Sequence, residues 1–357
     1  MTDLAELHED LRAVARELLA AGRPDAGVDW EELVRAGWTG MEVPEELDGA
    51  GATLAEVAVV CEELGRAAAR TPYLGSVVLA VGALARTAGC AGRDELLRDV
   101  ASGETGIAVA LDGALSGAAG PSFRLVEGAG GLRLHGRAGF VPDVADAARL
   151  LVPAAAPDGG VVLVALDAAT PGLTVTAQPV LDATRALGGL TADGVPVGDG
   201  TVWRAAGDGE AALRALLDRA ALAVACDSLG VAGAMLDRTV AYVGVREQFG
   251  RAIGSFQAVK HACADMLVQI TVARQLVGLA VRAVVAEDAD AGAAVARAKA
   301  YAGEAAVAVA GKAMQLHGGI GYTWESGVHL FLKRAALNRS LFGSPAEHRR
   351  ALAARLG

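Results

Sequence analysis

The chain has 357 residues, 53% of them hydrophobic and 21% charged, which excludes a disordered chain and predicts two or three packed domains. Its 42 acidic and 32 basic side chains give a formal net charge of −10, and no run of Lys and Arg offers a surface for nucleic acid. The longest stretch without a charged residue, residues 71–85, is shorter than the roughly 20 apolar residues of a spanning helix, so we predict no membrane span.

The N-terminal sequence MTDLAELHEDL is acidic and amphipathic, and it lacks the basic and apolar regions of a signal peptide. The four cysteines are far apart in the sequence and stand in apolar or helical contexts, where reduced structural thiols are expected. The six histidines show no metal-ligand spacing. We therefore predict a cytoplasmic protein without a metal site.

Residues 1–104 are predicted to form an N-terminal α-helical domain. Apolar residues recur at helical spacing from Leu54 to Leu64, while acidic residues fall on the opposite side of that helix. Thr53 follows a loop rich in Pro and Gly, and it is placed to cap the helix that begins after it.

Residues 105–207 are predicted to form a middle domain of antiparallel, barrel-like β structure. Here short β-branched runs alternate with Gly, Pro and Asp, as is typical of strands joined by turns. The segment 123–136 has the pattern of a hairpin, and the segments 161–167 and 173–180 have the pattern of strands.

Residues 208–357 are predicted to form a C-terminal four-helix bundle. The periodicity predicts three long helices, over residues 210–245, 256–287 and 291–316, and a last helix after the glycines that follow. Ser255 and Asp290 are predicted to cap the second and third of these helices. The fold class is therefore α+β multidomain, with helical, β and helical domains in chain order.

Two segments of the C-terminal domain carry candidate ligand-binding groups: REQFGRAIGSFQAVKHACADM from residue 246, and QLHGGIGYTWE from residue 315. Arg246 offers a fork of donors suited to a pyrophosphate, Gln248 offers an amide, and Phe249 offers a stacking face. The pair Gly318-Gly319 allows the backbone to approach a ligand closely. On these residues alone, a plain helix-to-helix turn and a glycine hinge are equally good interpretations.

These segments, together with VPEELDGAGATLAEVAVVCEELG from residue 43, resemble the acyl-CoA dehydrogenase family. The resemblance covers nearly the whole chain and is weakest in the β domain. It implies a helical domain, a small β barrel and a four-helix bundle, assembled as a tetramer with FAD bound between subunits. The residues that it implies as contacts to the neighbouring subunit's FAD are Arg246, Gln248, Phe249, Ile253, Gln257, Gln315, Gly318 and Gly319.

The resemblance also implies a reaction and its partners. Family members are flavoprotein oxidoreductases of lipid metabolism that dehydrogenate an acyl-CoA thioester between its α and β carbons. A carboxylate removes the α proton while the flavin N5 takes a hydride from the β carbon. The implied partners are an acyl-CoA substrate, homologous subunits in a homo- or hetero-oligomer, and an acceptor for electron transfer.

The sequence departs from the family at both positions where a catalytic base is found. In many members the base is the Glu of a YEGT motif, which corresponds here to residues 341–344 and places Phe342 at the Glu position. In a second group of members the base lies on the first long helix of the C-terminal domain, at the position of Ala220. Neither side chain can accept a proton.

Three acidic residues near these positions remain as candidates. Asp227 lies seven residues after Ala220, on the same face of the helix and in an apolar stretch. It is either the catalytic base or, as we favour, a buried and partnered structural carboxylate. Asp218 and Glu325 are expected to be exposed to solvent.

The β domain departs from the family at its flavin contacts. Leu111 stands at the position of a family Thr, and Phe140-Val141-Pro142 replaces a Trp-Ile-Thr or Trp-Ile-Ser segment. In the family the third of these residues directs its N–H at the flavin N5, and Pro142 has no N–H. The chain's own half of the flavin site is thus degraded, while the half that reaches a neighbour is intact.

This combination resembles a subunit of the actinobacterial α2β2 acyl-CoA dehydrogenases, in which only some flavin sites are filled. Three hypotheses stay open on the sequence. The chain is an FAD-dependent dehydrogenase, alone or with a homologous partner; or it is a structural subunit that completes a partner's FAD site; or it binds CoA thioesters without flavin.

Overall fold

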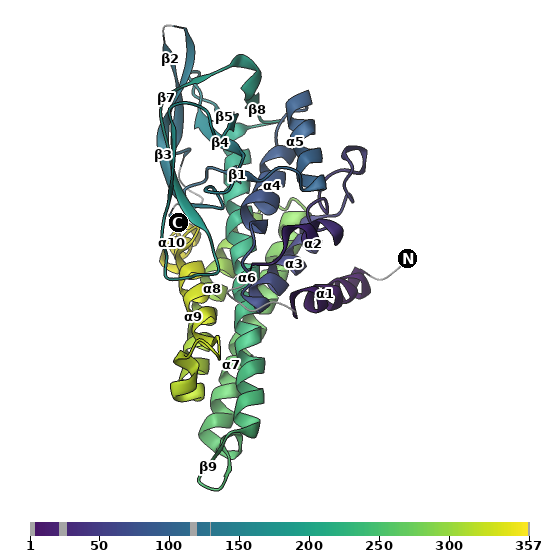
Figure 1. Ribbon diagram of the computed structural model, residues 1–357, viewed down its shortest axis with the longest axis vertical. Helices are drawn as coiled ribbons and strands as arrows, with labels where there is room; N and C mark the ends of the chain where they lie inside the picture. Colours follow the sequence, from purple (N-terminus) through teal and green to yellow (C-terminus); the bar gives the residue numbers. More distant parts are fainter. Residues whose placement is uncertain (1–3, 21–26, 115–119, 129, 356–357) are drawn as a thin grey trace.

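The computed structural model describes residues 4–20, 27–114, 120–128 and 130–355. It has a helical N-terminal part, a central sheet and a helical C-terminal part, arranged along one long axis (Figure 1). The α+β fold predicted from the sequence is confirmed. Helix gives way to strand between Ser102 and Ile107, and strand gives way to helix between Arg204 and Gly209.

The N-terminal part consists of short helices around one longer helix, α3. The α-helices are α1 (Leu4–Ala20), α2 (Trp30–Arg35), α3 (Leu54–Ala67), α4 (Ala80–Ala85) and α5 (Ala91–Ser102), with a 3₁₀ turn η1 (Glu45–Leu47) and a π-helical segment η2 (Leu74–Leu79). Thr53 caps α3 as predicted, because its hydroxyl oxygen accepts from the Ala55 N–H and the Glu56 carboxylate accepts from the Thr53 N–H.

The central part is one eight-stranded sheet in the order β6-β7-β3-β2-β4-β5-β8, with β1 beside β4. The strands are β1 (Ile107–Val109), β2 (Phe123–Gly128), β3 (Gly131–Pro142), β4 (Arg149–Ala155), β5 (Val161–Asp167), β6 (Leu173–Ala177), β7 (Leu187–Val197) and β8 (Val202–Arg204), with a 3₁₀ turn η3 (Asp199–Thr201) before β8. The predicted hairpin is confirmed as β2 and β3, which pair from Phe123 opposite Gly136 to Gly128 opposite Gly131.

The sheet is mixed, which corrects the expectation of a purely antiparallel domain. Strands β1 and β2 both run parallel to β4, β1 along Arg149–Leu151 and β2 along Ala154–Ala155. Alternation of apolar and polar residues predicts that a segment is a strand, but the direction of its neighbour depends on chain connections that the local pattern does not carry.

The C-terminal part contains the three longest helices. The helices are α6 (Gly209–Val245), α7 (Gln257–Val285), α8 (Ala291–His317), α9 (Val328–Ser340) and α10 (Pro345–Ala353); between them lie β9 (Glu247–Gln248), β10 (Arg251–Ala252), η4 (Ile253–Ser255) and η5 (Gly318–Tyr322). The first three match the predicted helices to within about two residues. The single last helix was wrong, since a turn at Leu341–Ser344 separates α9 from α10.

Two predicted helix caps were also wrong. The hydroxyl of Ser255 donates to the Ala252 carbonyl within η4, so Phe256 takes the position before α7. Asp290 precedes α8, but its side chain makes no capping hydrogen bond, while its backbone N–H donates to the carboxylate of Asp288. In both places the residue takes part in a local turn instead of capping the helix.

Helix α6 forms the centre of the molecule and crosses α3 at a close contact. A Cβ on Gly230 would overlap the carbonyl oxygen of Glu62, so only glycine allows the two helices to approach so far. Helices α6 and α7 are both long and apolar enough to cross a membrane. The most apolar window of α6 is 83% buried inside the protein, whereas that of α7 is only 22% buried.

Candidate functional site

The Arg246 segment folds into a hairpin at the end of the molecule away from the sheet, where Figure 1 labels β9. Strands β9 and β10 are joined by Phe249 and Gly250, whose φ values of 53° and 75° are those of a type I′ turn. The N–H of Ile253 donates to the Arg246 carbonyl at 2.8 Å and closes the hairpin. This turn leaves the Phe249 ring 92% exposed.

The Gln315 segment forms the end of α8 and the turn after it. Gly318 adopts φ 60° and ψ −142°, a conformation that other residues rarely adopt, and a Cβ on Gly318 or Gly319 would meet no atom within 4 Å. Exposed Gln315 accepts a hydrogen bond from Lys312 at 3.0 Å through Oε1. Its amide N–H groups are therefore free to donate to a ligand.

The structure brings the two segments to the same end of the helical domain. The rings of Tyr242, on the last turn of α6, and His317, the last residue of α8, stack with centroids 4.6 Å apart and planes 17° apart. The other two predicted contacts lie beside the hairpin, Ile253 half-buried in η4 and Gln257 exposed at the start of α7.

The donor set at this end fits an anionic dinucleotide. The Arg246 guanidinium is exposed, and within the described ranges no carboxylate forms an ion pair with it. Exposed amides of Gln248 and Gln315, the Phe249 ring and the open glycine turn surround the space next to it. This arrangement can bind a pyrophosphate and a flat aromatic ring.

The residues that replace the family's flavin and base contacts pack directly on one another. A Cβ on Gly113 would lie 2.5 Å from the Phe140 carbonyl oxygen and 2.7 Å from Leu341 Cδ1. The N–H of Gly113 donates to the Gly139 carbonyl at 2.9 Å, and the N–H of Phe342 donates to the Gly113 carbonyl at 2.7 Å. Close packing and two backbone hydrogen bonds therefore hold the three segments together.

Phe342, at one expected base position, is a buried side chain on a fixed turn. It is 1% exposed and has φ 55°. Its carbonyl oxygen lies 3.0 Å from His348 Nε2, and the carbonyl of the next residue, Gly343, accepts from Lys299 Nζ at 2.9 Å. A phenyl ring here supplies packing and no proton acceptor.

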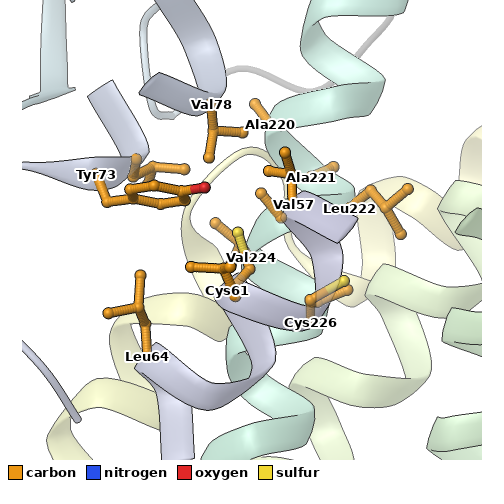
Figure 2. Close-up of a cluster of buried hydrophobic side chains, with 14 of the residues drawn as sticks. Val57, Cys61, Leu64, Tyr73, Val78, Ala220, Ala221, Leu222, Val224 and Cys226 are labelled. Atoms are coloured by element: carbon orange, nitrogen blue, oxygen red, sulfur yellow. The ribbon is translucent and has the colours of Figure 1, made fainter. Parts of the chain in front are cut away.

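Ala220, at the other expected base position, lies inside an apolar cluster (Figure 2). The figure draws it beside side chains from α3 and from the η2 region, among them Val57, Tyr73 and Val78. The Tyr73 hydroxyl donates to the Trp38 carbonyl, and burial raises the pKa of this phenol. The surroundings of Ala220 are therefore those of a packed core.

Asp227 lies between two buried arginines. Its carboxylate accepts from Arg334 at 3.0 and 2.7 Å and from Asn338 at 2.6 Å, and Arg185 lies at 3.0 Å. Burial alone would raise the pKa of Asp227, but the charges of Arg334 and Arg185 outweigh it and lower the pKa to about 2. A carboxylate with such partners is a weak base, so the geometry favours the structural alternative.

The two other acidic candidates differ from each other. Glu325 is exposed, as expected. Asp218 is half-buried, which corrects the expectation of a solvated side chain, and burial raises its pKa to about 6 although Arg355 and Arg214 lower it. Asp218 lies against the start of α8, where a Cβ on Gly292 would meet its carboxylate.

Two buried ionisable residues were missed by the sequence analysis. Asp143 accepts from the Gly75 N–H at 2.9 Å, and burial raises its pKa to about 6. Lys299 is 0% exposed, and burial lowers its pKa to about 7. The signal for Lys299 was present in the sequence, as a lysine in the alanine-rich stretch that forms α8.

Comparisons with known proteins identify the family and the fold. The family models described as acyl-CoA dehydrogenase N-terminal and C-terminal domains match residues 5–104 and 207–357. Acyl-CoA dehydrogenase IpdE2 of Mycolicibacterium smegmatis is 35% identical, over 98% of this chain and 94% of its own length. The ChsE4–ChsE5 complex from Mycobacterium tuberculosis matches with TM-score 0.88 and 30% identity over 98% and 97% of the two chains. The Tcur3481–Tcur3483 steroid ACAD matches with TM-score 0.87 and 34% identity over 99% and 98%.

Proposed function

Because this chain belongs to the acyl-CoA dehydrogenase family, whose cofactor is FAD, we propose that it completes the FAD site of a homologous neighbouring subunit in a dehydrogenase complex. The observation that carries the proposal is the contrast between its two half-sites. The Arg246 hairpin is exposed, whereas the segments at Gly113, Phe140 and Phe342 close on one another.

The position of the hairpin supports binding to another subunit's cofactor. It lies at the opposite end of the long axis from the body of the sheet (Figure 1), and therefore away from a flavin held against the body of this chain's own sheet. Arg246 would donate to the pyrophosphate, Gln248 and Gln315 would donate through their amides, and Phe249 would pack on the adenosine portion. When bound, FAD supplies the hydride acceptor of the reaction.

The neighbouring subunit is proposed to be a homologous chain that carries the catalytic base. Phe342 and Ala220 cannot accept a proton, and the pKa of Asp227 is about 2. Two of the similar structures are named as pairs of different chains, which makes a hetero-oligomer the first assembly to test. One of them is named a steroid ACAD, so steroid acyl-CoA thioesters are the first substrate class to test.

The test compares this chain alone with this chain co-expressed with a homologous neighbour. We expect little flavin absorbance from the chain alone, and flavin together with acyl-CoA-dependent reduction of an electron acceptor from the complex. FAD bound at one equivalent and robust turnover by the lone chain would contradict the proposal. Acyl-CoA binding by both preparations without any flavin would favour a flavin-independent CoA-thioester binding protein instead.

The Arg246→Ala variant tests the cofactor contact within that complex. Loss of a charged hydrogen bond typically costs about 1.5–3 kcal/mol, so FAD affinity should fall by about tenfold or more. The matched control is Arg204→Ala, which removes a 68% exposed arginine from β8. Equal FAD affinity in the wild-type and Arg246→Ala complexes would remove the hairpin from the cofactor site.

A further inference from the structure

We infer that Tyr242 and His317 are a positioning pair that holds the two cofactor-binding segments at a fixed separation. The inference rests on the proposed function and extends it to two residues that need not touch the cofactor. The stacked rings link the last turn of α6 to the last residue of α8, directly before the hairpin and the glycine turn respectively.

Both rings are fixed to the backbone that leads into a binding segment. The N–H of Arg246 donates to the carbonyl of Tyr242 at 2.9 Å, so the tyrosine and the first hairpin residue share one helical turn. His317 Nδ1 lies 2.8 Å from the Ala313 carbonyl oxygen. Since a carbonyl only accepts, Nδ1 carries the proton, and this bond fixes the plane of the imidazole ring.

The stack lies beneath the exposed groups that would meet the ligand. His317 is 7% exposed and Tyr242 is half-buried, while Arg246, Phe249 and Gln315 are exposed. Among the residues that the structure describes, no hydrogen bond joins residues 246–256 to residues 315–322. The stacked pair is therefore a side-chain contact between the two helix ends that lead into these segments.

A dinucleotide that contacts both segments binds best when their separation is set before binding. Helices α6 and α8 pack on each other, and the stack adds a contact at their ends that restricts motion of the two segments before binding. Aromatic pairs contribute a modest free energy beyond their buried area. We expect loss of either ring to weaken FAD binding by about threefold to tenfold.

The test uses the complex with the homologous subunit and measures FAD affinity by flavin fluorescence and retention on dilution. Tyr242→Ala and His317→Ala should weaken FAD binding, and the double variant should be little worse than either single one, because both remove the same contact. Tyr242→Phe keeps the two rings in contact and should bind FAD as the wild type does. His317→Phe keeps the stack but loses the hydrogen bond to the Ala313 carbonyl, so its FAD affinity should lie between those of the wild type and His317→Ala. Tyr301→Ala, which removes a half-buried aromatic ring elsewhere on α8, is the matched control and should leave FAD affinity unchanged.

The outcomes separate this inference from the proposed function. If Arg246→Ala weakens binding while Tyr242→Ala and His317→Ala do not, the positioning pair is refuted and the proposed function stands. If Arg246→Ala also has no effect, the proposed function itself fails. If Tyr242→Phe loses affinity as strongly as Tyr242→Ala, the hydroxyl binds directly and the positioning role is overturned. Should the alanine variants not fold, normal binding by Tyr242→Phe still supports stacking, and weak binding contradicts it.

Discussion

Asp227 illustrates how a candidate catalytic acid acquires another role through distant partners. The sequence places it on a helix face with Ala220, in an apolar segment, which is where a base would be sought. Its arginine partners come from the β6–β7 loop and from α9, at positions 185 and 334. No local pattern predicts that these chain segments meet. The sequence therefore left open whether Asp227 is a catalytic base or a structural carboxylate, and the ion pairs favour the structural role.

Asp227 should make the folded protein sensitive to acid between pH 4 and pH 2. Its pKa is lowered from 3.8 to about 2, so the unfolded chain binds this proton first as the pH falls. The stabilisation is present above the unfolded value, is lost as the pH falls through the folded value, and amounts to roughly 2 kcal/mol. Chemical denaturation of wild type and Asp227→Asn across this window measures it.

The Asp227→Asn variant also leaves two buried guanidinium groups without their carboxylate. Breaking one partner of a buried ion pair typically costs about 3–5 kcal/mol, which would remove a large part of the stability of the chain. Asp158→Asn, at an exposed ion pair with Arg204, is the matched control and should cost far less, because solvent screens such a pair. Equal losses of stability in the two variants would mean that the buried ion pairs stabilise the fold no more than the exposed ion pair does.

Lys299 should produce a second rise of stability with pH, in neutral to alkaline solution. Its amine donates to the carbonyl groups of Asn338 and Gly343 at 2.9 Å, and burial lowers its pKa from 10.5 to about 7. The unfolded chain therefore binds more protons between these two values, and stability should rise with pH across this window. Lys299→Met should flatten that rise by roughly 1–4 kcal/mol, as measured by the difference between the two denaturation profiles. Parallel profiles would contradict the assigned pKa.

At the scale of elements, periodicity predicted the helices better than it predicted the turns. The three long C-terminal helices were placed to within about two residues, because each is a long segment of helix-forming residues that ends at a clear break. The break between α9 and α10 was not predicted, since it depends on positive φ at Phe342 and Gly343 that distant contacts impose. The parallel strand pairs in the sheet were also not predicted, because strand direction depends on chain connections that a local pattern does not carry.

The crossing of α3 and α6 can be tested with two glycines of the same helix. Gly230→Ala would force a methyl group into the Glu62 carbonyl, and overpacking of this kind typically costs about 1–3 kcal/mol or more. Gly244→Ala, at a position where a Cβ meets nothing within 4 Å, should instead stabilise the helix by up to about 1 kcal/mol. Thermal unfolding of the two variants should therefore shift in opposite directions, and shifts of the same sign would refute the close crossing.

At the scale of the whole molecule, the exposed face of α7 is the feature that the single chain leaves unexplained. This helix is apolar along its length, yet only 22% of its most apolar window is buried. Its large exposed side chains include Leu267, Val268, Val272 and Leu279. A surface of this kind is expected to be covered by another subunit. The sequence predicted an oligomer from its hydrophobic content and from the cofactor contacts that the family resemblance implies across subunits, and α7 carries an exposed apolar face that such a subunit could cover.

Charges placed on that face should break the assembly without unfolding the chain. Leu267→Glu and Val268→Glu alter side chains that are 55% and 62% exposed, so the fold of the single chain should tolerate them. In an apolar interface, however, each charge would lose its water without gaining a partner. We expect light scattering to show a smaller particle at low micromolar concentration, and FAD to be lost with the assembly, because the Arg246 hairpin is proposed to act across a subunit boundary. Val126→Glu, at a 41% exposed position on β2, is the control and should leave the particle intact.

A wild-type chain that is a stable, folded monomer at this concentration even with its homologous neighbour present would refute both the assembly and the shared cofactor site.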